Sequence, residues 1–293
     1  MAVRRAGWQA AFVLVVIAGA TQAATGGKVA AADKTIFVAA LDPAGKPVKG
    51  LTAVDFALRE DGVDREITDV KPATQPLQIV LLADTTKGVD EILQDMRRSL
   101  TAFVRQVHSA SPDASIRVME FGQAAVGVTP FSSSTDDLEK AIGRLAGKPG
   151  AASVLLEGII RASDDLGKRP SPRRAIVAVN MEPSDEQSRE EPKKIIESMR
   201  RSVAQLWAIS YQRGTAKNPQ RDVVLNALTK NTGGRREFIV GISAIETILK
   251  DYADALTSQY EVTYKRPEGK AQVVQVGVRR EGVKLYASGF APQ

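Results

Sequence analysis

The sequence contains no cysteine and a single histidine among its 293 residues. The absence of cysteine excludes disulfides, thiolate metal sites, a cysteine nucleophile and a lipid-modified cysteine. His108 is the only imidazole base that a Ser-His-Asp triad could use. It lies just beyond Val107, near the end of a helical pattern, where a basic side chain is favourable, so we interpret it as structural. A triad hydrolase is therefore not expected.

A strong excess of charge of one sign is also missing. The formal net charge is +6, spread over many residues. The densest basic stretch, residues 168–174, lies in a proline-containing loop just before a predicted strand, at the amino edge of a sheet. Solubility accounts for this modest charge, and we predict no nucleic-acid partner.

The first residues have the pattern of a secretory signal, which we assign to residues 1–23. Arg4 and Arg5 precede an apolar run over residues 10–20, and small residues suited to cleavage follow at 21–24. Spanning a bilayer takes about 20 apolar residues, so an uncleaved anchor is the less favoured alternative. We therefore expect export to the periplasm or the medium, with no stable membrane anchor after cleavage. The arginine pair leaves the export route open.

Both ends of the remaining chain have the composition of β-structure. β-Branched and aromatic residues alternate with polar ones in short runs separated by turn residues. These runs cover residues 35–41, 56–59, 65–70, 260–264, 274–278 and 283–287. The Asp61-Gly62 turn predicts a hairpin between the second and third runs. We expect the terminal segments, residues 24–75 and 258–293, to pack together as a small β extension or sandwich.

The segment between them, residues 76–257, alternates predicted strands with predicted helices. The clearest helical pattern starts at Val89 and places apolar residues on one face as far as Val107. Residues 116–121 and 126–128 flank a glycine-containing turn and predict one antiparallel edge hairpin. Such alternation predicts an α/β fold, with a mainly parallel central sheet and helices on both faces.

Asp84 is the most informative residue of this segment. It ends the apolar run 77–83, a predicted buried strand, and opens a loop before a helix. In open α/β sheets, ligands bind outside the carboxyl ends of the strands. Thr86 and Ser153, the latter on a predicted neighbouring loop, add hydroxyl groups. Mg²⁺ takes carboxylate and hydroxyl oxygens from proteins, so a divalent-cation site is one hypothesis for this edge.

The order of elements and these residues resemble the von Willebrand factor A domain and its metal-ion-dependent adhesion site. That site has Asp-x-Ser-x-Ser after the first strand, Thr in a second loop and Asp after a later strand. Asp84 matches the first residue, Thr86 keeps a hydroxyl in place of the first Ser, and Ser153 stands at the Thr. Gly88 replaces the second Ser, and Met181, whose thioether is a poor Mg²⁺ ligand, replaces the last Asp. The resemblance implies a Rossmann-like fold with a degenerate adhesion site.

The flanking segments are similar to a bacterial subfamily of exported proteins, the VWFA-related domain proteins. The motifs that carry this similarity lie at residues 41–48, 51–56, 60–62, 231–235, 259–264 and 287–290. The resemblance implies a noncatalytic module that binds another protein. Family members hold their partners through the metal, whose open coordination position takes an acidic side chain of the partner.

One interpretation of the loop keeps a metal. Mg²⁺, or Mn²⁺ or Ca²⁺ in its place, would bind through Asp84, Thr86 and Ser153. Glu182 or Asp185 would then replace the lost carboxylate. A single firm carboxylate rarely holds Mg²⁺ tightly, which weakens this interpretation.

Two other interpretations need no metal. Lys87 or an ordered water could neutralise Asp84 in a loop that still binds protein. Alternatively, Asp84 could simply cap the helix that begins near Val89. The sequence alone does not choose among the three.

The predicted function is that of an exported adhesion or interaction module that uses the loops at the carboxyl edge of the sheet. The predicted partner-binding residues are Asp84, Thr86, Lys87, Ser153 and Glu182. An alternative is a structural or assembly component of the cell envelope that acts through its terminal β segments. A haloacid-dehalogenase-like phosphatase with Asp84 as nucleophile is disfavoured, because Thr86 stands where a second Asp is required.

Overall fold

The apolar run before Asp84 forms the central strand of a six-stranded sheet in the computed structural model of the chain. All seven residues of β5 (Gln78–Asp84) are buried, and the strand lies between two parallel neighbours. A parallel strand covered on both faces must be apolar on both, which explains its continuous hydrophobic run. The structure describes residues 31–182, 185–212, 218–267 and 269–292, so the predicted signal segment lies outside it.

The sheet has the order β10-β9-β8-β5-β6-β7. Its other strands are β6 (Ser115–Phe121), β7 (Val126–Gly127), β8 (Arg174–Met181), β9 (Gln205–Tyr211) and β10 (Arg236–Ile239). β7 runs antiparallel to β6, as the sequence predicted, and the remaining neighbours are parallel. Loops that follow the parallel strands therefore meet at one edge, the carboxyl edge.

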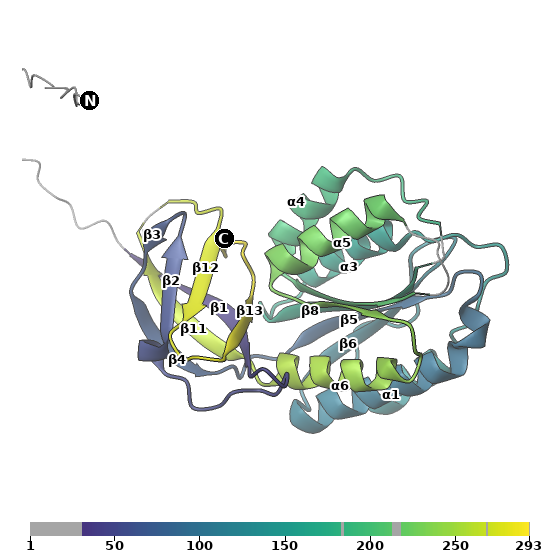
Figure 1. The fold of residues 1–293 in the computed structure, drawn as a ribbon, viewed down its shortest axis with the longest axis horizontal. Helices are drawn as coiled ribbons and strands as arrows, with labels where there is room; N and C mark the ends of the chain where they lie inside the picture. Colours follow the sequence, from purple (N-terminus) through teal and green to yellow (C-terminus); the bar gives the residue numbers. More distant parts are fainter. Residues whose placement is uncertain (1–30, 183–184, 213–217, 268, 293) are drawn as a thin grey trace, which may run out of the picture.

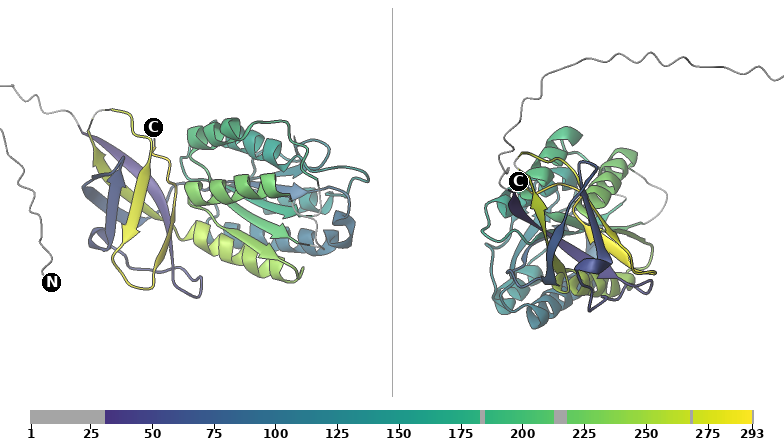
Figure 2. Two further views of the ribbon diagram at one scale, coloured as in Figure 1. Left: turned by 45° about the horizontal axis from the view of Figure 1, so that its top comes forward. Right: turned by 90° about the vertical axis from the view of Figure 1, so that its left-hand side faces the viewer.

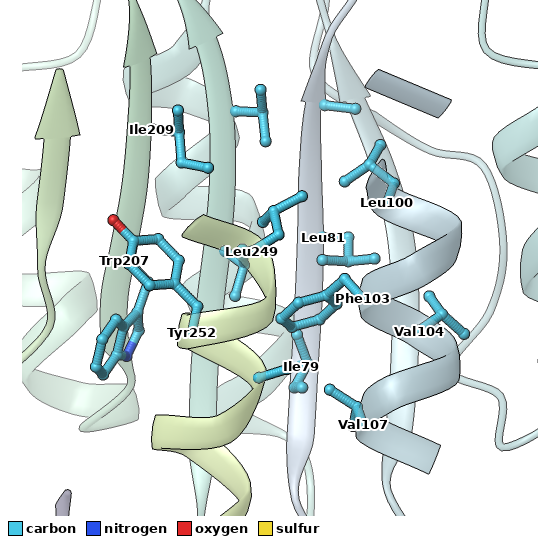
Figure 3. Close-up of a cluster of buried hydrophobic side chains, with 14 of the residues drawn as sticks. Ile79, Leu81, Leu100, Phe103, Val104, Val107, Trp207, Ile209, Leu249 and Tyr252 are labelled. Atoms are coloured by element: carbon cyan, nitrogen blue, oxygen red, sulfur yellow. The ribbon is translucent and has the colours of Figure 1, made fainter. Parts of the chain in front are cut away.

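Helices cover both faces of this sheet (Figure 1). Ile79 and Leu81 of β5 pack against α1 and α6 (Figure 3), whereas Val80 and Leu82 pack on the opposite face, against α3, α4 and α5. The helices are α1 (Leu93–Ala110), α2 (Thr135–Gly143), α3 (Leu155–Gly167), α4 (Pro192–Ser202), α5 (Pro219–Thr232) and α6 (Ala244–Thr257), with the short 3-10 helices η1 (Ala53–Asp55) and η2 (Val89–Glu91). This arrangement confirms the predicted α/β fold. Among the described residues, every helix is too short or too polar to cross a lipid bilayer.

The two ends of the chain form a separate β unit beside the α/β unit (Figure 2). One of its sheets has the order β13-β1-β11-β4 and the other the order β12-β2-β3. Its strands are β1 (Ala32–Leu41), β2 (Phe56–Glu60), β3 (Val63–Asp64), β4 (Ile67–Pro72), β11 (Tyr260–Arg266), β12 (Val274–Val278) and β13 (Lys284–Ala287). β1 pairs antiparallel with both β11 and β13, so the terminal segments hold each other.

The predicted hairpin around Asp61-Gly62 is wrong in its second strand. β2 does turn there, but it pairs with β3, which has only two residues. The segment predicted to be its partner forms β4, which pairs with β11 in the other sheet. Ile67 and Val70 of β4 thereby pack onto the apolar cluster shared by both sheets. The turn residues fix where the chain reverses, whereas burial of these side chains decides the strand neighbour.

A buried arginine joins the two units. Arg173, which is 3% exposed, donates from Nε to the side chain of Gln259 over 2.9 Å. Its other nitrogens donate to the backbone oxygens of Ala73, Gln75 and Leu256. These acceptors belong to both connections between the α/β unit and the β unit. Burial lowers the pKa of Arg173 to about 10, so the side chain stays charged at neutral pH.

Candidate functional site

Asp84 lies at the carboxyl end of β5, where its carboxylate joins two loops. Its Oδ1 accepts the backbone N–H of Thr86 over 2.7 Å, and its Oδ2 accepts that of Met181, also over 2.7 Å. The side chain is only 1% exposed. Burial raises the pKa of Asp84 to about 6, against the hydrogen bonds from Thr86 and Met181 and the charge of Arg221. The carboxylate thus holds the loop after β5 to the end of β8.

Ser153 connects the loop before α3 with the loop after β8. Its hydroxyl donates to Glu186 over 3.0 Å and accepts the N–H of Leu155 over 3.3 Å. Its backbone N–H donates to the carbonyl of Asp185, and its carbonyl accepts the N–H of Gln187. Burial raises the pKa of Glu186, opposed by the hydroxyl donors and by the charge of Arg221. Ser153 is fully buried and its hydroxyl is already engaged.

Glu182 follows β8 and lies in a buried pair of salt bridges. Its Oε2 is 3.1 Å from Nη2 of Arg221, and its Oε1 is 2.8 Å from Nη2 of Arg236. All three side chains are at most 3% exposed. Burial alone would raise the pKa of Glu182, but the charges of Arg221 and Arg236 outweigh it and the pKa is lowered. Glu182 is therefore an ionised, fully engaged carboxylate.

Arg221 is the central cation of this cluster, and the sequence analysis missed it. It lies in the first turn of α5 with a fully buried side chain, and its Nη1 is 3.9 Å from the carboxylate of Glu186. Its charge acts on Asp84, Glu182 and Glu186 alike. One signal was available: Asn218 caps α5 and Pro219 begins it, which places an arginine in the first turn. A cation there opposes the helix dipole, which requires compensating carboxylates.

The structure separates the predicted site residues into two groups. Asp84, Thr86, Ser153 and Glu182 gather at the carboxyl edge, and all are buried. Lys87 is exposed, and its backbone N–H donates to the carbonyl of Ala151. The positive charge that acts on Asp84 is that of Arg221. Asp84 does not cap the following helix, because Gly88 is the N-cap residue of η2 and the Asp84 oxygens accept the N–H groups of Thr86 and Met181.

The donor set at this edge is a poor match for a divalent cation. Mg²⁺ requires oxygens that are free to turn toward it. Both oxygens of Asp84 accept backbone N–H groups, the Ser153 hydroxyl bonds Glu186, and Met181 offers sulfur. Among the described residues, no group of three His, Cys, Asp or Glu side chains could hold a metal ion. Arg221 already supplies a positive charge to the carboxylates here.

Two exposed apolar side chains lie on and just beyond β10, the outer strand of the same sheet. Phe238 is 46% exposed and Val240, just beyond β10, is 79% exposed. The guanidinium carbon of Arg236 lies 4.2 Å from the centroid of the Phe238 ring. Because Arg236 also binds Glu182, this exposed patch is directly connected to the buried charge cluster.

No protein-family model and no curated protein matches the sequence, whereas many solved structures match the fold. A von Willebrand factor type A structure from Catenulispora acidiphila gives a TM-score of 0.51 at 14% identity, covering 85% of this chain and 76% of that one. Proximal thread matrix protein 1 from the mussel byssus, solved with a zinc-occupied MIDAS motif, gives a TM-score of 0.53 at 13% identity, covering 69% of this chain and 50% of that one.

The PilB minor pilin from Streptococcus sanguinis gives a TM-score of 0.50 at 10% identity, covering 64% of this chain. The present chain spans 62% of that pilin and half of the byssus protein. Likeness at such low identity concerns the fold alone. The chain thus has a von Willebrand factor A fold, as its sequence predicted.

Proposed function

We propose that this chain is an exported, noncatalytic module that binds another protein through the loops at the carboxyl edge of its central sheet, and that it does so without a metal. The fold supports the general class of interaction module. The metal-free part of the proposal rests on one observation, the buried Arg221 beside the carboxylates of Glu182 and Glu186.

The charge balance explains why a guanidinium can take the place of a metal. Buried carboxylates need a compensating positive charge close by. Arg221 lies 3.1 Å from Glu182 and 3.9 Å from Glu186, and its charge opposes the burial that raises the pKa of Asp84. Because this cation is covalently part of α5, the loops are held in place at any metal concentration.

Burial also divides the roles of the predicted site residues. Asp84, Thr86, Ser153 and Glu182 are at most 3% exposed, so a partner cannot contact them on the closed surface. They position the loops. Lys87 is the predicted residue that a partner can contact directly. We add Phe238 and Val240 to the contact surface, since exposed apolar side chains on an edge strand favour association.

The same geometry disfavours the phosphatase alternative. A phosphoryl-accepting aspartate must present a free oxygen to its substrate. Both oxygens of Asp84 accept backbone N–H groups, and the side chain is 1% exposed.

The proposal can be tested by site-specific photo-crosslinking in the cells that produce the protein. A crosslinking amino acid replaces Lys87 in one variant and Lys168 in another; Lys168 follows α3 at the opposite, amino edge, and its side chain is 76% exposed. We expect a discrete protein adduct from position 87, retained in chelator and absent from position 168. Equal crosslinking from both positions, or an adduct that chelator abolishes, would contradict the proposal.

A further inference from the structure

A groove of about 470 Å³ lies where the β unit meets the helices of the α/β unit. Its walls come from α4 and α5 on one side and from β12 and β13 on the other, strands that lie close to these helices in Figure 1. Apolar side chains line much of it, including Ile196, Val276, Leu285 and Phe290. The size lies within the range of ligand pockets, which is about 300–1,000 Å³.

Two of the motifs noted in the sequence build this groove. Residues 231–235 begin in the last turn of α5 and run beyond it, and residues 287–290 begin at the last residue of β13. The N–H of Gly289 donates to the carbonyl of Asn231 over 2.8 Å. A Cβ atom on Gly233 would lie 2.0 Å from the backbone of Ala287, and its φ of +69° also favours glycine. These glycines allow the two units to approach closely beside the groove.

The groove carries positive charge without acidic lining. Arg200 and Lys230 line it, and no aspartate or glutamate does. Within the described parts of the chain, neither of the two forms an ion pair with a carboxylate. Arg200 instead donates to the side chain of Gln272 and lies 5.1 Å from the ring centroid of Phe290. An occupant that combines apolar and acidic groups would complement these walls.

The backbone of β12 adds a reason to expect a peptide. Asp61 N–H donates to Val273, and Arg279 N–H donates to Asp55, so the odd-numbered residues of β12 bond to β2. Because hydrogen bonding alternates along an antiparallel strand, Val276 directs its N–H and C=O away from β2. Val274, whose backbone groups also point away from β2, donates its N–H to the carbonyl of Gly289. β12 and β13 belong to different sheets of the described structure, which leaves the Val276 groups outside any ladder.

We propose that this groove binds an extended segment of another protein in which apolar residues alternate with acidic ones. The apolar side chains would cover Val276 and Leu285, and the acidic ones would pair with Arg200 and Lys230. The backbone of the segment would bond to Val276, in the manner of strand addition. This site is separate from the carboxyl edge and does not depend on the function proposed above.

The test is fluorescence anisotropy with three labelled hexapeptides added to the mature protein. The first alternates glutamate with valine, the second alternates lysine with valine, and the third is the acidic peptide with N-methylated valines. We expect saturable binding of the acidic peptide and affinity at least about tenfold weaker for the other two, because they lose the charge pairs or the backbone bonds.

Protein variants locate the binding. Reversing both charges, R200E with K230E, should weaken binding of the acidic peptide at least about tenfold. Lys193→Glu is the matched control, since Lys193 lies on α4 outside the groove with its side chain 82% exposed. The proposal is overturned if no peptide binds saturably, if acidic and basic peptides bind equally, or if the double reversal has no more effect than the control. Binding to anionic vesicles but not to peptide would also overturn it.

Discussion

Two buried arginines hold opposite ends of this fold, and they do so with different partners. Arg221, at the carboxyl edge, lies beside the carboxylates of Glu182 and Glu186, and its charge also favours the ionised form of Asp84. Arg173, at the junction with the β unit, binds three backbone carbonyls and the amide of Gln259. Arg173, which donates to neutral oxygens, joins chain segments. Arg221 also joins segments, and in addition it neutralises the negative charge of the carboxylates beside it. Of these two positions, the carboxyl edge is the one where buried carboxylates lie beside the arginine.

The largest expected effect is that of removing the cation at the carboxyl edge. Arg221→Met leaves buried carboxylates without their main compensating charge, which should lower the free energy of unfolding by about 3–5 kcal/mol. Arg221→Lys keeps the positive charge, so its free energy of unfolding should fall by less than that of Arg221→Met. Urea unfolding at neutral pH measures both. The control is Lys230→Met on the same helix, an exposed position where the change should be within about 0.5 kcal/mol. Equal stability of Arg221→Met and the control would contradict the account.

A second prediction concerns the proton on Asp84. Burial raises the folded-state pKa from 3.8 to about 6, so the folded protein binds this proton more tightly than the unfolded chain does. The stabilisation of the folded state by this proton is complete below about pH 4 and is lost as the pH rises through about 6. The unfolding free energy of the protein, measured relative to that of Asp84→Asn, which does not titrate, should therefore fall by about 3 kcal/mol as the pH rises across this range. A pH-independent difference would contradict the assignment.

The smallest of the three stability effects is expected at the junction. Arg173→Met removes hydrogen bonds to neutral acceptors and leaves no buried charge behind, so the loss should be about 2 kcal/mol. It should also loosen the β unit against the α/β unit, which hydrogen exchange at Ala73 and Gln259 would detect. Lys168→Met, in the same basic stretch but exposed, is the control. A loss as large as that of Arg221→Met would remove the distinction between the two arginines.

The sequence predicted the local elements and the position of Asp84, because these follow from short-range patterns. The run before Asp84 is long, apolar and bounded by a loop, and it became the central strand. The two arginines were not recognised, because burial of a charged side chain depends on partners distant in sequence. Arg173 lies 83 residues before its acceptor Leu256, and Arg221 lies 39 residues after Glu182.

The same limit explains the strand that was misplaced. Residues 65–70 were predicted as β-structure and residues 67–72 form β4, but the neighbouring strand β11 lies far along the chain. Periodicity shows which face of a strand is apolar, and not which sheet will cover it. The same limit applies to the site residues. Ser153 and Glu182 were predicted to lie at the carboxyl edge of the sheet, where the structure has them, but their burial depends on contacts with Glu186, Arg221 and Arg236.

The most direct test of the proposed metal-free site is calorimetric titration of Mg²⁺ and Mn²⁺ into the purified protein without residues 1–23, with Asp84→Ala as the control. The account predicts no saturable heat from either protein at millimolar metal, because Arg221 already supplies the positive charge and the Asp84 oxygens are engaged. Saturable binding to the unmodified protein that disappears in Asp84→Ala would contradict it, and would show that a metal can displace these contacts.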